Sequence, residues 1–124
     1  ENPLAFAKEA NLLPALVDEF ELAMDDLPIA FLPGKDHPSV VFVAGLEPGT
    51  SAFVTKDGLW NGKYAPAYLR RYPFIIGDVD DGESVLCVDD SFEGLSKKDG
   101  VRFFSDDGKP EEAVSNALAL AQNY

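Results

Sequence analysis

With 124 residues, of which 46% are hydrophobic, the chain is long enough to form one domain with its own core. Its 22 acidic residues outnumber its ten basic residues and give a formal net charge of −12, which argues against nucleic acid as a partner and against a bare anionic membrane surface. No apolar run is long enough to span a bilayer, so we expect no transmembrane segment.

The first expected element is a helix near residues 17–26. Phe20, Met24 and Leu27 recur at helical spacing with Val17 behind them, which predicts that these four side chains face the core. Acidic residues occupy the positions between them and are expected to face solvent. The proline that follows ends the helix.

Three hairpins are expected in the middle of the chain. Their arms are residues 28–32 with 39–46, residues 51–55 with 59–64, and residues 73–79 with 84–90. The connections are rich in Gly, Pro and Asp, which is typical of turns, and the arms of the third hairpin are rich in β-branched residues. The sequence is interpreted as having no internal repeat.

Two more helices are expected, a short one at residues 66–71 and a C-terminal one near residues 110–122. Pro66 and Pro110 suit first helical turns, and Pro73 closes the short helix. Because hairpins outnumber crossover connections, the pattern predicts an α+β fold with a largely antiparallel sheet, formed as a single domain over residues 1–124.

Arg70 and Arg71 stand side by side among three tyrosines, Tyr64, Tyr68 and Tyr72. One interpretation is an anion site, in which a guanidinium binds a carboxylate or phosphate with help from tyrosine hydroxyl groups. The other is structural: each guanidinium pairs with an acidic residue of a neighbouring hairpin. With 22 acidic residues in the chain, we favour the structural interpretation.

Trp60 lies next to a turn with polar neighbours. An exposed Trp60 would serve as a contact anchor for a partner, whereas a buried one would cover an end of the core. The sequence leaves both open.

The sequence indicates no metal, cofactor or catalytic set. The acidic run at residues 78–83 departs from the EF-hand pattern and suits a solvated turn better than a calcium site. One histidine and one cysteine are too few for zinc, so none is expected. Cys87 lies in an apolar strand and is expected to be buried, and a Cys87–His37 nucleophile pair is not favoured.

Several segments, taken in order, resemble the bacterial SapC-like family, which is named from surface-layer loci. The matching stretches are "EF" at 19–20, "LPIAF" at 27–31, "FVTKDGLWNGKYAPAYLRRYPF" at 53–74, "LCVDD" at 86–90 and "FFSDDGKPEEAV" at 103–114. The block around "WNGKYAPAYLRRYPF" is the most specific, because it combines Trp, Tyr, Pro and Arg so densely.

The resemblance implies that the chain corresponds to the N-terminal portion of a longer protein, cytoplasmic or associated with the cell envelope. It implies a structural or interaction domain linked to the surface layer, for which a protein partner is expected, and it carries over no catalytic residue, cofactor or substrate. The alternative is a small-ligand module that binds an anion. The candidate binding or fold-critical residues are Trp60, Tyr64, Tyr68, Arg70, Arg71 and Tyr72, together with Pro66 and Pro73.

Overall fold

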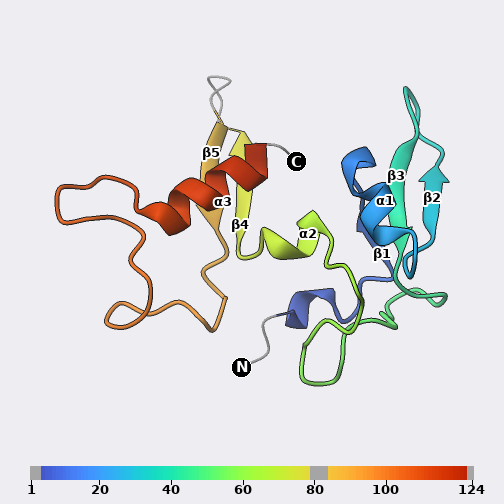
Figure 1. The fold of residues 1–124 in the computed structure, drawn as a ribbon, viewed down its shortest axis with the longest axis horizontal. Coiled ribbons are helices and arrows are strands. Elements are labelled where there is room, and N and C mark those ends of the chain that lie inside the picture. The colour runs from blue at the N-terminus through green and yellow to red at the C-terminus, as the bar shows by residue number, and fades with distance from the viewer. Residues whose placement is uncertain (1–3, 79–83, 123–124) are drawn as a thin grey trace. The chain divides into compact units, whose positions relative to one another are not determined.

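The chain divides into two units, residues Glu1–Arg70 (unit 1) and Arg71–Tyr124 (unit 2). The computed structural model describes residues 4–78 and 84–122. Each unit has its own small antiparallel sheet and its own helices, which Figure 1 labels. The predicted α+β class with antiparallel sheets is therefore confirmed.

Three short strands form the sheet of unit 1. They are β1 (Leu12–Pro14), β2 (Ile29–Leu32) and β3 (Ser39–Val43), and they lie in the order β1-β3-β2, all antiparallel. Strands β2 and β3 are the arms of the first predicted hairpin, which is confirmed. The sequence prediction missed β1, because three residues that end in a proline give no periodic signal.

Strand β3 is the centre of this sheet, and two consecutive side chains on it, Val41 and Phe42, are both buried. Successive side chains on a strand point to opposite faces, so both faces of the sheet are covered at this point. On one of these faces, Phe42 belongs to the core cluster of unit 1. That cluster consists of Ala7 from the 3₁₀ turn η1 (Ala5–Ala7), Leu13, Ala23, Leu27, Phe42, Ala44 and Leu69.

The helix predicted near 17–26 is present but is shorter and rotated. It consists of a 3₁₀ turn η2 (Val17–Glu19) followed by α1 (Phe20–Ala23). Val17 and Met24, which we expected in the core, are exposed. Leu27 is buried as predicted and Phe20 packs against the core cluster, while the other two inward side chains are Glu19 and Ala23. The prediction was wrong for Val17 and Met24 because it assigned only apolar residues to the core, whereas a glutamate occupies one of the inward positions.

The second predicted hairpin is reduced to one isolated bridge, between Val54 and Trp60. The short helix predicted at 66–71 is present as α2 (Ala67–Arg70), which begins one residue after a buried proline, Pro66, and is one residue shorter than predicted at each end. The Pro66 carbonyl accepts hydrogen bonds from the backbone N–H groups of Leu69 and Arg70. Helix α2 therefore places Leu69 in the core cluster and leaves the Arg70 side chain at the surface.

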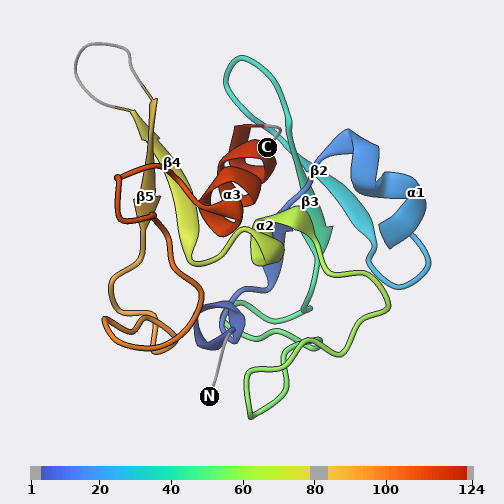
Figure 2. The same ribbon diagram turned by 60° about the vertical axis from the view of Figure 1, so that its left-hand side comes forward.

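Unit 2 is a hairpin covered by one helix. Strands β4 (Phe74–Asp78) and β5 (Ser84–Val88) pair antiparallel, which confirms the third predicted hairpin, although its turn lies outside the described residues. Helix α3 (Glu112–Gln122) packs against β4 and lies beside the hairpin in both views (Figures 1 and 2). Its buried side chains are Val114 and Ala121, which are seven residues apart and therefore lie on one face of the helix. The helix begins after Pro110, which pairs with Phe104 in an isolated bridge instead of opening the helix.

A nine-residue turn motif occurs once in each unit, at residues 53–61 and 103–111, contrary to the interpretation that the chain has no repeat. In both copies the first residue is Phe, the third is Thr or Ser, and Asp-Gly follows at positions five and six. The hydrogen bonds also match: Thr55 N–H donates to Leu59 O, as Ser105 N–H does to Lys109 O, each at 2.9 Å. The repeat is too short and too divergent to stand out in the sequence.

Candidate functional site

A buried carboxylate organises the most distinctive part of unit 1. Glu19 lies at the end of η2, and only 4% of its surface is exposed. Its Oε2 atom accepts a hydrogen bond from the Leu16 backbone N–H at 3.1 Å, which satisfies a free donor at the start of the helical segment. This local contact turns the Glu19 side chain inward.

The other carboxylate oxygen of Glu19 binds the segment that precedes and begins α2. Oε1 accepts hydrogen bonds from the Ala67 backbone N–H at 2.6 Å and from the Tyr64 hydroxyl at 2.9 Å. A buried charge is costly unless it is hydrogen-bonded, and here both oxygen atoms have donors. Glu19 thus joins two segments that are more than forty residues apart in the chain.

Arg70 completes this arrangement from the surface side. Its Nη2 atom lies 4.0 Å from Glu19 Oε1 and donates a hydrogen bond to the Tyr64 hydroxyl at 3.0 Å, and its Nε donates to Ala65 O at 2.9 Å. The guanidinium also lies over the Tyr64 ring, 5.5 Å from the ring centre, at a distance typical of a cation–π contact. We call Glu19, Tyr64 and Arg70, with the Ala67 N–H, the Glu19 network.

The chemistry of the network is visible in Tyr64. Burial raises the pKa of the Tyr64 hydroxyl above its ordinary value, and the hydrogen bond and negative charge of Glu19 raise it further. The positive charge of Arg70 acts in the opposite direction. Tyr64 is therefore a neutral donor to Glu19 and an acceptor from Arg70, and it connects a buried anion to a surface cation.

A second connection joins α1 to the same segment. The Lys63 backbone N–H donates to Asp26 Oδ2 at 2.7 Å, and the Lys63 ammonium lies 3.7 Å from the Asp25 carboxylate. Together with the Glu19 network, this contact fixes residues 63–67 against the end of the helical segment.

The other aromatic candidates of unit 1 are packed at the edge of its core. Trp60 stacks on Phe53 with ring centres 5.2 Å apart, and its Nε1 donates to Tyr64 O at 2.9 Å. Tyr68 lies 6.3 Å from the ring of Phe6. Trp60 and Tyr68 are half-buried and pack against the core cluster, so their observed contacts are with the fold of unit 1 itself.

The remaining two candidates, Arg71 and Tyr72, belong to unit 2 and are half-buried. The Tyr72 hydroxyl donates to Asp89 Oδ2 at 3.1 Å, and the ring meets Phe92 edge-on at 5.3 Å. Hydrogen bonds from the Ser91 hydroxyl, the Ser91 backbone and the Tyr72 hydroxyl lower the pKa of Asp89. The peptide bond between Tyr72 and the following proline is cis.

Sequence reasoning missed Glu19, although it identified Tyr64 and Arg70. The available signal was its spacing from Ala23, because residues four apart lie on one face of a helix, and Leu27 continues that line. A search that considers apolar residues alone selects the wrong face of a helix when a charged residue is buried and hydrogen-bonded by several donors.

The rotation of the helix leaves a mixed apolar and acidic surface on its outer side. Two neighbouring rows, each with the spacing i, i+4, i+7, are exposed over their full length. We call these six residues the outer face of α1: Val17, Glu21 and Met24 in one row, and Asp18, Leu22 and Asp25 in the other. The apolar members Val17, Leu22 and Met24 are 68%, 61% and 63% exposed.

Groups suited to metal or nucleophilic chemistry are dispersed. Within residues 4–78 and 84–122, no three His, Cys, Asp or Glu side chains gather closely enough to bind a metal ion. Most of the acidic run at 78–83 lies outside the described residues. His37 is in the exposed loop before β3, and Cys87, which we expected to be buried, is exposed on β5 because its strand belongs to a hairpin with one uncovered face.

A comparison with protein families identifies the family of the chain. A model of the SapC family matches residues 1–124, and the chain therefore belongs to the SapC family. No curated protein and no solved structure matches it. In the described part of the chain, no helix has both the length and the apolar character to cross a membrane.

Proposed function

We propose that this SapC domain is a non-enzymatic interaction module of the bacterial surface layer or cell envelope, and that it binds a protein partner through the outer face of α1. Family membership supports the link to the surface layer, because the family is named from surface-layer loci. The observation that carries the interaction role is the exposure of Val17, Leu22 and Met24 on one short helical segment.

The organisation of unit 1 supports this choice of surface. Glu19 occupies the inward position, so the apolar side chains on the opposite side have no place in the core of the unit. Three large apolar side chains exposed within one short helical segment are more than the isolated exposed apolar residues that are ordinary on a surface, and this composition favours a contact surface.

The chemistry of the outer face also indicates the kind of partner. Asp18, Glu21 and Asp25 alternate with the apolar residues, so a complementary surface carries apolar side chains with Lys or Arg between them. The net charge of −12 adds a long-range attraction to a basic surface.

The alternative, an anion module built on Arg70 and Arg71, is less well supported. The Arg70 guanidinium already contacts Glu19, Tyr64 and Ala65 within unit 1. These contacts favour a role for Arg70 in holding the fold, where a guanidinium neutralises the chain's own carboxylate.

The test is binding to the purified surface-layer protein of the source organism, measured by fluorescence anisotropy of the labelled domain. In the test variant, Val17→Thr, Leu22→Gln and Met24→Gln remove the apolar patch and retain its acidic residues. Each truncated contact is worth about 1 kcal/mol, so we expect at least about tenfold weaker binding.

The matched control is Leu46→Gln, because Leu46 is 96% exposed and lies in a loop outside the outer face of α1. This variant should bind like the unchanged protein. Equal binding by the triple variant would exclude the outer face of α1 as the contact surface, and no binding by the unchanged domain would exclude the surface-layer protein as its partner.

A further inference from the structure

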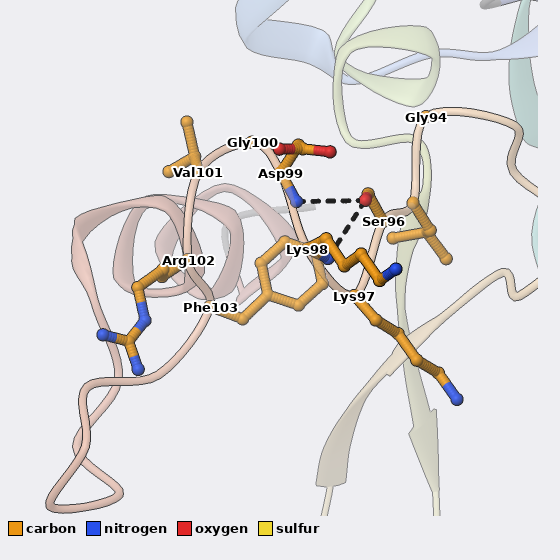
Figure 3. A pocket seen from close by; sticks show the side chains of 10 residues that line it. Gly94, Ser96, Lys97, Lys98, Asp99, Gly100, Val101, Arg102 and Phe103 are labelled. Carbon is orange, nitrogen blue, oxygen red and sulfur yellow. Dashed lines mark hydrogen bonds between the residues drawn. The ribbon is translucent and has the colours of Figure 1, made fainter.

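The loop between β5 and α3 encloses an open hollow of about 470 Å³, lined by consecutive residues from Gly94 to Phe103 (Figure 3). This volume lies within the range of small-molecule sites. All of the lining residues belong to unit 2, so the hollow is a property of that unit alone.

The charge of the lining is opposite to that of the protein. Lys97, Lys98 and Arg102 line the hollow against one carboxylate, that of Asp99, in a chain whose formal net charge is −12. Three of the ten basic residues thus lie within six consecutive positions. A local excess of positive charge attracts anions to this loop.

The basic residues that line the hollow differ in whether they form ion pairs within the chain. The Arg102 guanidinium is hydrogen-bonded to the Asp106 carboxylate in the adjoining turn. Lys97 and Lys98 make no ion pair with any residue in the described part of the chain. Figure 3 shows both lysine side chains on the same side of the Phe103 ring. The two ammonium groups therefore remain able to bind an external anion.

The loop is held in shape by contacts that do not involve the lysine side chains. The Ser96 hydroxyl oxygen accepts hydrogen bonds from the backbone N–H groups of Lys98 at 3.2 Å and Asp99 at 3.1 Å. The Phe103 ring packs on Phe74 of β4 with ring centres 5.4 Å apart. Phe103 thus gives the hollow an aromatic wall that is anchored to the hairpin.

We propose that this hollow binds a small phosphate ester that carries a ring. A phosphate monoester has a charge of about −1.5 to −2 at pH 7, which matches two ammonium groups. Lysine binds phosphate as a point charge, whereas the planar arginine fork that suits a carboxylate is held here by Asp106. The ring of the ligand packs against Phe103.

The experiment is a titration of the ¹⁵N-labelled domain with phenyl phosphate, followed by the amide NMR signals of residues 96–103. We expect saturable shifts confined to this loop, and affinity about tenfold lower in the double variant Lys97→Gln, Lys98→Gln, since each exposed ion pair is worth up to about 1 kcal/mol. The matched control is Lys35→Gln, Lys56→Gln, which changes the net charge equally in unit 1 and should leave the affinity unchanged.

Two further ligands test the chemistry. Inorganic phosphate should bind more weakly than phenyl phosphate, because it lacks the ring, and benzoate should bind more weakly because it carries one charge. Equal affinity for phenyl phosphate in the two double variants, shifts spread over unit 1, or the absence of any saturable shift would overturn the proposal. If inorganic phosphate bound as tightly as phenyl phosphate, the proposed contact between the ligand ring and Phe103 would be wrong.

Discussion

Glu19 illustrates how one side chain can decide the local fold. A buried carboxylate loses its hydration, and that cost is offset only when its oxygen atoms receive hydrogen bonds. Here Leu16 N–H, Ala67 N–H and the Tyr64 hydroxyl supply those bonds, and Arg70 lies near enough to contribute a favourable charge. The conformation of α1 and the position of the segment before α2 both depend on this residue.

We therefore expect Glu19→Gln to destabilise unit 1. The amide keeps the shape of the side chain but lacks the charge. Its NH₂ group replaces a carboxylate oxygen that accepts a hydrogen bond from a backbone N–H, so two donors face each other. A loss of about 1–3 kcal/mol in the free energy of unfolding is expected for such a mismatch. Urea unfolding followed by Trp60 fluorescence measures it, since Trp60 is the chain's one tryptophan.

Glu21→Gln provides the control for this substitution. Glu21 is exposed on the outer face of α1. The free energy of unfolding of the Glu21→Gln variant should therefore remain within about 0.5 kcal/mol of that of the unchanged protein. If the Glu19 and Glu21 variants were equally stable, the Glu19 network would not contribute to the fold as described.

Tyr64 makes the stability of unit 1 decrease with rising pH in the alkaline range. Because burial and Glu19 raise the pKa of Tyr64, the folded state binds the phenolic proton more tightly than the unfolded state. The resulting stabilisation is fully present below the unfolded pKa of 10.0 and is lost as the pH rises through the folded pKa.

Tyr64→Phe should therefore have a lower free energy of unfolding at pH 7, because a hydrogen bond to a charged group is lost, but should lose less stability between pH 9 and 11 than the unchanged protein. Denaturant unfolding at several pH values compares the two slopes. Parallel decreases in both proteins would show that another group is responsible for the alkaline loss.

At the scale of single elements, the turn motif shows that the same short sequence pattern produces the same geometry in both units. Gly58 and Gly108 occupy equivalent positions and have positive φ angles of 71° and 79°. A side chain is strained in this backbone region, and glycine is not. The matching hydrogen bonds follow from this shared backbone conformation.

Gly108→Ala isolates the backbone effect, because an added Cβ atom would meet no heavy atom within 4 Å beyond its own residue and its two chain neighbours. We expect a loss of about 1 kcal/mol in the free energy of unfolding, from strain alone. Gly108→Asn should lose less, since asparagine tolerates positive φ better than alanine. Denaturant unfolding followed by circular dichroism measures both, and equal stability of the alanine variant would contradict a positive φ at this position.

At the scale of the whole molecule, the two units differ in the quality of their cores. The core cluster of buried residues in unit 1 draws on a three-stranded sheet, η1, α1 and α2. Unit 2 relies on a two-stranded hairpin with Ile75, Val85 and Cys87 exposed on one face, and on α3 against the other. Two-stranded sheets are marginal by themselves, so α3 is essential to unit 2.

This difference predicts unequal hydrogen exchange. The amides of β3 that bond to neighbouring strands should exchange slowest in the chain, and those of β4 and β5 faster, because exchange follows local opening free energies. Val114→Ala removes buried methyl groups of α3, at a cost of about 1 kcal/mol, and should accelerate exchange in β4 and β5 while leaving β3 unchanged. Equal acceleration in β3 would show that the units open as one, as the predicted single domain requires.

Elements with local signals could be predicted from the amino-acid sequence. The hairpins of β2 with β3 and β4 with β5 follow from β-branched arms and turn residues, and α3 follows from a regular apolar stripe. The dense aromatic and arginine block also identified SapC family membership, which the family comparison confirms. These properties depend on residues close together in the chain, so a linear pattern contains them.

Which faces are buried depends on contacts between segments that are far apart in the chain, so the assembled fold was needed to identify them. The inward position of Glu19 depends on donors from residues more than forty positions away, and no periodicity contains that information. The same contact leaves Val17 and Met24 at the surface and engages Arg70 within unit 1. A buried charge is stable only where distant groups can hydrogen-bond to it, so its position is a property of the assembled fold and not of the local sequence.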